Sequence, residues 1–498
     1  MSRDRRSRRA TPRATPAPGA PSRLAPWVAP LAALAGALAY GATLGYGFVW
    51  DDAATVVLNT HITSLARLPA LFTEHAFAGA GDALAGVTRY YRPLWTSSLA
   101  IDHALWGARA AGYHLTNVLL HAATCAALAR ALLARTGVAI AAMAGAVLFA
   151  LHPVHVEAAA WVSGRNELLL ALGVVLADLA WQHVRRGGGA RAVAATAGAT
   201  LAALLSKETA VVVPLLLACD EWRRRAPRWG AWAIVTAVTA AFVVLRLAWM
   251  PAPEDPLPLA TRVLSAPWLV VQYLRLLFVP MPLHVYHWVT PVESPLSPAF
   301  WGPLAALAVY GWLVVWTARR DRTLAFGLAW IVVALLPVSG ILGWPRPSPL
   351  AERYLLLPSV GWAIVVAALA ARAAASPRRI VRDGVLALGV GLAVAFAAGT
   401  ALQLPVWRDD LVLLQRITRD APAWTNGRAA LARVYAKAGR WDDAVAEFRV
   451  AADLERGNPS RAVELARALE RAGRPDEAAQ VLSDARRAGD LVPIVPPR

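Results

Sequence analysis

Repeated apolar runs, separated by polar connections, constrain this chain more than any other feature of its sequence. A helix needs about 20 apolar residues to cross a bilayer, and eleven runs approach that length, several of them falling short of it. They lie at 24–47, 113–133, 138–152, 168–184, 190–206, 209–222, 229–249, 301–318, 324–343, 354–372 and 384–403. Only 16% of the residues are charged, compared with about 25% in a soluble domain. We therefore predict an all-α, polytopic membrane helix bundle.

The arginines predict how this bundle is oriented. Residues 1–23 contain seven arginines and one acidic residue in a segment rich in Pro, Ala and Ser, which indicates a disordered basic tail on the cytoplasmic side. Further arginines cluster in alternate connections, at Arg130 and Arg135, Arg185–Arg191, Arg223–Arg228, Arg319–Arg322 and Arg372–Arg382. All of them fit the cytoplasmic side if the chain crosses the membrane eleven times. Because the net charge of +18 is placed in this way, we expect membrane lipids rather than nucleic acid as partners.

Two apolar segments, 93–106 and 267–280, are too short for this count. Adding either one alone as a span would move every later arginine cluster to the wrong side, so we interpret both as helices at the membrane surface or as half-spans. Residues 24–403 then form the transmembrane domain, with an external loop at 48–112. The other external connections are 153–167, the turn Ser206–Glu208, 250–300 and 344–353.

The last hundred residues follow a different pattern, with a period of 34 residues. Leu431, Ala432, Gly439, Ala444 and Ala451 recur as Leu465, Ala466, Gly473, Ala478 and Ala485. This is the tetratricopeptide period, so residues 404–488 are predicted to form a short α-solenoid, followed by a tail at 489–498. Two and a half repeats are few for a free-standing array, and we expect them to pack against the membrane domain or a protein partner. The repeats are predicted on the external, periplasmic side of a bacterial cytoplasmic membrane.

Asp51 and Asp52 follow the first apolar run directly. Adjacent carboxylates at a membrane surface could act as a general base, hold a divalent metal, or cap the helix expected at 53–58. Arg92 stands before Pro93 later in the same loop, and it either faces the site or snorkels to the interface.

The stretch "HPVHVEAAAWVSGRNE" at 152–167 concentrates polar residues between two apolar runs. These residues are His152, His155, Glu157, Arg165, Asn166 and Glu167. Buried ionisable groups need partners or water, so we predict a water-filled cavity here. We expect Glu157 and Arg165 each to contact a partner or water, and a pair between the two is one alternative. Zinc is the rival interpretation, but the His-Glu-x-x-His spacing is missing.

Three further sets of polar residues belong to this face or to a neighbouring helix. Lys207 and Glu208 occupy the tip between two apolar runs, where an unpaired lysine would be costly. Glu352 and Arg353 either form a local ion pair or face the cavity. His114, Asn117 and His121 share one helix face, which favours a hydrogen-bonded seam between helices. Cys125 and Cys219 both lie in apolar runs and suggest no disulfide framework.

Several motifs occur together in one order along the chain. They are the Asp51–Asp52 pair, Asn59, "YRPL" at 91–94, "GYHLTNVLLH" at 112–121, "HPVHVEAAAWVSGRNELL" at 152–169, "SKE" at 206–208 and "ERYLLLPS" at 352–359. With the repeats that follow, the chain resembles the transmembrane and tetratricopeptide-repeat O-mannosyltransferases of the GT-C superfamily, which use polyprenyl-phosphate sugars. The resemblance covers about residues 46–485, and the array is shorter than in the animal members.

This resemblance implies a GT-C type bundle that moves a sugar, mannose, from a lipid-linked donor to a hydroxyl acceptor such as protein Ser or Thr, with inversion. It makes Asp51 or Asp52 the catalytic base. It gives donor-phosphate binding to Arg92, Arg165, Lys207 and Arg353. It assigns the sugar pocket or its support to His152, His155, Glu157, Asn166, Glu167, Glu208 and Glu352. The alternatives are a membrane scaffold that recruits partners through its repeats and a sugar-lipid carrier, neither of which needs an acidic pair beside the cations.

Overall fold

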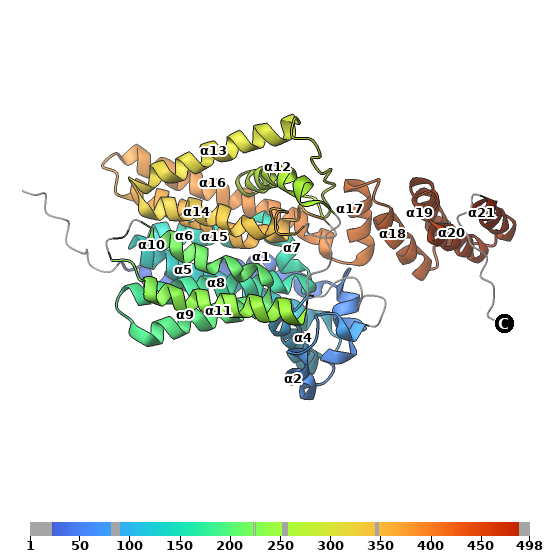
Figure 1. The fold of residues 1–498 in the computed structure, drawn as a ribbon, viewed down its shortest axis with the longest axis horizontal. Coiled ribbons are helices and arrows are strands. Elements are labelled where there is room, and N and C mark those ends of the chain that lie inside the picture. Colours follow the sequence, from blue (N-terminus) through green and yellow to red (C-terminus); the bar gives the residue numbers. More distant parts are fainter. Residues whose placement is uncertain are drawn as a thin grey trace, which may run out of the picture.

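The computed structural model describes residues 22–80, 90–222, 224, 226–250, 257–343 and 348–487. The basic tail predicted at 1–23 therefore lies outside the described residues except for its last two, and the tail predicted at 489–498 lies outside them entirely. The described residues form helices and turns with no strand, as predicted. Figure 1 shows a bundle of long, nearly aligned helices from which the C-terminal helices extend at one end.

Eleven helices of the described part correspond to the eleven predicted runs. They are α1 (Val28–Tyr40), α5 (Ala110–Thr136), α6 (Ala139–Ala150), α8 (Arg165–Arg185), α9 (Gly189–Ser206), α10 (Val213–Glu221), α11 (Trp229–Trp249), α13 (Pro298–Ala318), α14 (Arg322–Leu335), α15 (Leu356–Ala374) and α16 (Arg379–Gln403). By length and composition, eight helical segments can cross a membrane, or nine if the bent pair Ala139–Ala150 and Pro153–Ala160 is one span. Helices α10 and α14 are shorter. The chain is an integral membrane protein.

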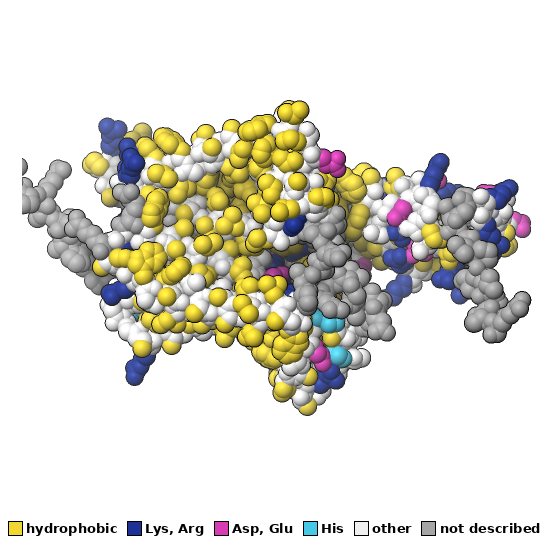
Figure 2. Space-filling view, in the orientation of Figure 1, with side chains coloured by type: hydrophobic (Ala, Val, Ile, Leu, Met, Phe, Trp, Pro, Cys, Tyr) yellow, Lys and Arg dark blue, Asp and Glu magenta, His cyan; other side chains and the backbone are white. Residues whose placement is uncertain are grey.

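Contacts between distant residues define the two ends of the bundle. Gly47, which follows the first span, donates a hydrogen bond to the carbonyl of Arg408, which follows α16 (3.0 Å). We call this the repeat end. Arg135 near the end of α5 pairs with Asp220 near the end of α10 (2.9 Å), and we call that the basic end. Hydrophobic side chains cover the bundle between the two ends, and arginine side chains project from the basic end (Figure 2).

Close approach of small residues holds the bundle together at its centre. A Cβ added at Gly361 of α15 would lie 2.7 Å from the carbonyl oxygen of Gly327 in α14, and one at Gly327 would lie 2.8 Å from that of Gly361. Either contact is shorter than a packed methyl group tolerates. Small residues therefore let these two helices pack backbone to backbone, as is common between helices in membranes.

The two short apolar segments form helices that stay at the repeat end. Helix α4 (Pro93–Trp106) begins after Arg92, which pairs with Glu208, and near its C-terminal end Asp102 pairs with Arg165. Helix α12 (Leu259–Phe278) contacts the carbonyl of Ile341 through Arg262 (3.1 Å) near its start, and the carbonyl of Leu277 accepts from His152 (3.1 Å) near its end. Because both ends of each helix contact the same end of the bundle, neither crosses it.

The C-terminal module is a helical solenoid with the predicted period. Its helices are α17 (Asp410–Asp420), α18 (Thr425–Lys437), α19 (Trp441–Leu454), α20 (Pro459–Arg471) and α21 (Pro475–Arg487). Gly439 and Gly473, 34 positions apart in sequence, end α18 and α20 with positive φ angles of 75° and 77°, a conformation that glycine adopts without steric cost. The repeats pack against the membrane domain through α17, where Asp410 accepts a hydrogen bond from the N–H of Trp50 (2.8 Å).

Candidate active site at the repeat end

Asp52 is a buried anchor of the loop that follows α1. Its Oδ1 accepts hydrogen bonds from the backbone N–H (2.8 Å) and the hydroxyl (2.6 Å) of Ser163, and its Oδ2 accepts from the N–H of Val49 (3.1 Å). Although Asp52 precedes the helical turn Ala53–Val57, its side chain makes no capping hydrogen bond, so the capping interpretation is wrong for this residue. Asp52 instead fastens its loop to the start of α8.

Asp51 lies in a different environment from its neighbour. Its side chain is half-buried and has no hydrogen-bond partner among the described residues. Burial raises the pKa of Asp51 to about 6, against the opposing effect of Arg353. Burial also raises the pKa of Asp52 to about 7, against the hydrogen bonds from Ser163 and Val49. Asp51 is thus the carboxylate of the pair that is open to a ligand.

Trp50 connects Asp51 to the repeats. It has a φ of 54° and is the one non-glycine residue with positive φ in the described part of the chain, a conformation that is costly for a bulky side chain. Its N–H donates to Oδ1 of Asp410 in α17 (2.8 Å). Its ring lies 6.0 Å from that of Trp424 and 6.3 Å from that of Trp161. The repeat module therefore holds the residue next to Asp51.

Arg353 and Glu157 form an ion pair close to Asp51. The guanidinium pairs with Oε1 of Glu157, and the backbone N–H of Arg353 donates to Oε2 (2.9 Å). The guanidinium also lies over the rings of Trp161 (5.6 Å) and Tyr354 (4.6 Å). The side chain keeps 15% of its surface exposed, so it is not closed off from a ligand.

Glu352 does not pair with its neighbour Arg353. Its Oε1 accepts hydrogen bonds from the N–H of His284 (2.6 Å) and from Nε2 of His287 (3.2 Å). The alternative of a local ion pair between Glu352 and Arg353 is therefore wrong. The two side chains point to different partners because they occupy successive positions of one helical turn, Glu352–Leu355.

Two more ion pairs continue the cluster away from Asp51. Lys207 pairs with Glu167, and its Nζ lies 4.5 Å from the centre of the Tyr354 ring. Arg92 makes a two-point contact with Glu208, with Nε and Nη2 at 3.0 and 2.6 Å from the carboxylate oxygens. Burial would raise the pKa of Glu208, but Arg92 outweighs it and lowers the pKa to about 2. Each predicted phosphate-binding cation of this group therefore already carries a carboxylate partner.

Arg165 does not fit the predicted role in phosphate binding. Its guanidinium pairs with Asp102 (2.5 Å) and donates to Oδ1 of Asn117 (2.8 Å) and to the carbonyls of Ser98 (3.2 Å) and Tyr113 (2.9 Å). The side chain is fully buried. Arg165 and Glu157 each have a partner, as expected, but the alternative that they pair with each other is wrong. Arg165 instead connects α4, α5 and α8.

The remaining predicted residues are buried and hold the segments around the site in place. His152 contacts the carbonyl of Leu277, and Nε2 of His155 lies 2.7 Å from the hydroxyl of Ser359; both histidines are fully buried. Asn166 donates to the carbonyl of Ser163 (2.8 Å). The predicted seam along α5 is confirmed, since His114, Asn117 and His121 contact the carbonyls of Gly47 (3.2 Å), Trp161 (3.0 Å) and Ala150 (3.2 Å).

No group of three or more His, Cys, Asp or Glu side chains in the described residues is arranged to hold a metal ion. Both oxygens of Asp52 accept protein hydrogen bonds, so Asp51 is the freer ligand of the pair.

Three residues that contribute to the site were not predicted from the sequence. Ser163 and Trp161 stand inside the polar stretch but look unremarkable there. Asp410 lies 360 positions from Trp50, and no local pattern marks it.

The fold and the site together define a polytopic helical membrane protein with a cluster of ion pairs at one end, where a tetratricopeptide module docks. The family model of the tetratricopeptide repeat matches residues 435–491. Protein O-mannosyl-transferase Tmtc1 of Drosophila melanogaster is 36% identical over 203 residues, which is 38% of this chain and 23% of that protein. Tmtc2 of the same organism is 33% identical over 264 residues, 48% of this chain and 28% of that protein.

Protein O-mannosyl-transferase F38B6.6 of Caenorhabditis elegans is 25% identical over 346 residues, covering 66% of this chain and 49% of that protein. These relatives confirm the resemblance that the sequence motifs indicated. The chain spans less than half the length of these three curated relatives. No solved structure matches it.

Proposed function

We propose that this chain transfers mannose from a polyprenyl-phosphate donor to a hydroxyl group, that of a protein Ser or Thr, on the external face of the membrane. The observation that carries the proposal is the contrast between the two adjacent aspartates. Asp52 is saturated with hydrogen bonds, whereas Asp51 is half-buried, has no partner among the described residues and has a pKa of about 6. A general base works best when its pKa lies near the operating pH.

The proposed step is a single displacement at the anomeric carbon. The acceptor oxygen forms a bond to that carbon, the bond from the carbon to the phosphate oxygen breaks, and the polyprenyl phosphate leaves with the electron pair. Asp51 takes the proton of the acceptor hydroxyl. Attack from the side opposite the phosphate inverts the anomeric centre.

Arg353 is the proposed phosphate ligand nearest the base. It lowers the pKa of Asp51 and keeps part of its side chain exposed, and an arginine fork matches a phosphate group in shape and charge. Lys207 and Arg92 extend the positive groups away from Asp51, each beside a glutamate. We propose that the glutamates hold these cations in place before the donor arrives, which reduces the cost of ordering them.

The buried residues act as positioning residues in this proposal. Arg165, His152, His155, Asn166 and Glu352 hold the segments that carry the site. Glu157, Glu167 and Glu208 orient the cations and shape the sugar pocket. A divalent metal at Asp51 and Asp52 is a separate proposal, and comparing transfer with EDTA and with added Mg²⁺ or Mn²⁺ tests it.

The repeats are proposed to handle the acceptor or another protein partner, since they lie at the same end as Asp51. The basic end would then face the cytoplasm, in agreement with the arginine distribution. Reporter fusions after Arg135 and near position 425 should report opposite sides of the membrane. If both report the same side, the proposed orientation is wrong.

A transfer assay tests the proposal. Purified full-length protein is mixed with labelled polyprenyl-phosphate-mannose and a Ser/Thr-rich acceptor peptide, and the label is located on the peptide. We expect transfer that is lost in Asp51→Asn, with donor binding preserved. Donor binding without transfer by the wild-type chain to the peptide or to periplasmic extract would instead favour the sugar-lipid carrier, and neither binding nor transfer would favour the scaffold.

A further inference from the structure

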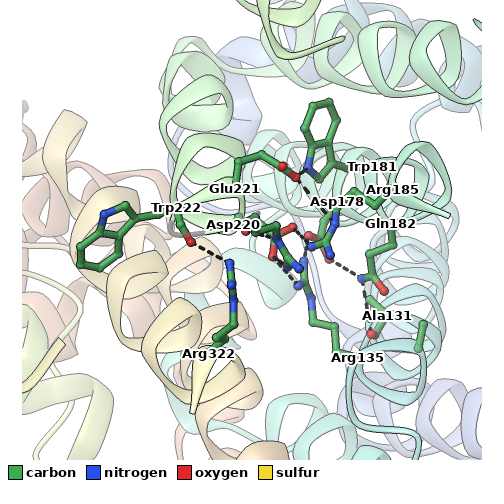
Figure 3. Close-up of polar contacts among 12 residues, drawn as sticks. Ala131, Arg135, Asp178, Trp181, Gln182, Arg185, Asp220, Glu221, Trp222 and Arg322 are labelled. Carbon is green, nitrogen blue, oxygen red and sulfur yellow. Dashed lines mark hydrogen bonds and ion pairs between the residues drawn. The ribbon is translucent and has the colours of Figure 1, made fainter. Parts of the chain in front are cut away.

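The basic end contains a hollow that the proposed transfer does not use. It lies between the C-terminal ends of α5 and α10 and the connection from α13 to α14. The residues that line it include Arg135, Asp220, Trp222, Arg224, Arg322 and Phe326. Figure 3 shows Arg135 and Arg322 converging on this region from two sides.

The inner part of the hollow is an ion network with a buried arginine at its centre. Arg135 pairs with Asp178 and with Asp220 (2.9 Å), and its guanidinium lies 4.2 Å from the centre of the Phe326 ring. Asp220 is shared with Arg185 (2.5 Å) and Arg224 (3.1 Å). Arg135 is 7% exposed, yet its Nε has no hydrogen-bond partner among the described residues. Such an unsatisfied donor in a buried site calls for a ligand or water.

The lining is rich in arginine. Three arginines, Arg135, Arg224 and Arg322, line the hollow together with one carboxylate, Asp220, and Arg135 also pairs with Asp178 beside it. Arg224 is partly exposed and Arg322 is exposed, so these two side chains stand toward the opening. Arg322 donates to the carbonyl of Trp222 (2.7 Å), and the Trp222 side chain is 44% exposed.

We infer that this hollow binds the phosphate of an anionic membrane lipid. Arginine side chains bind phosphate oxygens through paired N–H groups. Basic pockets between transmembrane helices on the cytoplasmic side bind anionic lipid headgroups, and a partly exposed tryptophan at the end of a helix favours the headgroup region. The phosphate lies between Arg224 and Arg322 at the opening, with Arg135 beneath it.

This inference is independent of the proposed transferase reaction. The hollow shares no residue with the site around Asp51 and lies at the other end of the bundle. A lipid bound there would connect α10 with α14, two helices that are too short to count among the candidate membrane spans.

The test uses purified full-length protein in detergent and measures the binding of dioctanoyl phosphatidylglycerol by native mass spectrometry and by thermal shift. Dioctanoyl phosphatidylcholine and inorganic phosphate serve as comparison ligands. We expect phosphatidylglycerol to bind at least tenfold more tightly than either, and the binding to weaken about tenfold in Arg224→Gln and in Arg322→Gln. Arg322→Lys should retain part of the affinity because it keeps the charge.

The matched control is Arg379→Gln, because Arg379 begins α16 at the same end and its side chain is 86% exposed, paired only with Asp383 among the described residues. Binding should be unchanged in this variant. Equal weakening in Arg379→Gln would overturn the inference, since it would mean non-specific attraction to a basic surface. Inorganic phosphate that binds as tightly as the lipid would also overturn it, because the hollow would then recognise free phosphate. Unaltered lipid binding in folded Arg224→Gln and Arg322→Gln would exclude the hollow as the site.

Discussion

The two ends of the bundle are built from the same kinds of ion pair but differ in the group that they leave open, a carboxylate at the repeat end and the Nε–H of Arg135 at the basic end. At the repeat end, Glu157, Glu167 and Glu208 pair with Arg353, Lys207 and Arg92, and Asp51 remains without a partner among the described residues. At the basic end, Asp178, Asp220 and Glu221 pair with Arg135, Arg185 and Arg224, and Arg322 lines the same hollow and donates to the carbonyl of Trp222 (2.7 Å).

This difference separates a site that can carry out acid–base chemistry from a cluster that stabilises the bundle and can bind an anion. Buried ion pairs are costly to form and costlier to break, so the presence of charged residues at either end says little about function. The groups that remain open to a ligand are more informative. A carboxylate without a hydrogen-bond partner can accept a proton, whereas a cluster of arginines can hold an anion but offers no base.

The largest expected effect comes from the two aspartates. Asp51→Asn should reduce transfer by roughly 10²–10⁴-fold, the usual contribution of a general base, with little change in thermal stability because its carboxylate makes no hydrogen bond within the described structure. Asp52→Asn should instead lower stability, since an amide cannot accept from both Val49 and Ser163. Transfer rates and melting curves of the two variants distinguish these roles. Equal loss of stability in both would make Asp51 a second anchor.

At the basic end, the expected effect is on stability. Arg135→Gln leaves the buried Asp178 without its arginine, while Asp220 keeps Arg185 and Arg224; breaking a buried ion pair typically costs about 3–5 kcal/mol. Arg186→Gln is the matched control, because Arg186 is exposed at the same end and donates only to the carbonyl of Ala134 among the described residues. Thermal denaturation in detergent measures both variants. Similar melting temperatures would mean that the ion network at the basic end does not stabilise the bundle.

A smaller effect is expected where the repeats meet the site. Asp410→Ala removes the acceptor that holds the strained Trp50, and we expect kcat to fall about tenfold, because a misplacement of about 1 Å costs up to 10²-fold, while KM for the donor changes little. Asp410→Asn keeps an acceptor oxygen and should restore most of the activity.

The control for this prediction is Asp409→Ala. Asp409 caps α17 by accepting from the N–H of Val412 (2.9 Å), so its loss weakens the same helix without touching Trp50. If Asp409→Ala lowers kcat as much as Asp410→Ala does, the effect is one of helix stability rather than of positioning.

The smallest expected effect is the pH dependence of transfer. Asp51 must be ionised to accept a proton, so kcat/KM should rise with pH and reach half of its plateau near pH 6, the pKa of Asp51. Arg353 favours the charged form of Asp51, and in Arg353→Gln the midpoint should therefore move to higher pH. A pH–rate profile from pH 4.5 to 8 measures both midpoints. A profile that is flat across this range would exclude Asp51 as the base.

The sequence by itself predicted the elements and the chemical composition of the site. Apolar runs predict helices because hydrocarbon excludes unpaired backbone groups, and the 34-residue period predicts the repeats because each repeat buries the same positions. The arginine distribution also predicted that 93–106 and 267–280 stay at one end, in agreement with the contacts of α4 and α12. These features depend on local pattern and on the solvent around each segment.

Which charge meets which partner was decided by the tertiary structure. Arg353 pairs with Glu157 across 196 positions rather than with the adjacent Glu352, and Arg165 pairs with Asp102 rather than with Glu157. Neighbours in sequence point in different directions along a helical turn, so proximity in the chain does not predict contact. The same holds for the aspartates: Asp51 and Asp52 are chemically identical, and only the buried hydrogen-bond donors of Val49 and Ser163 make one an anchor and leave the other open to a ligand.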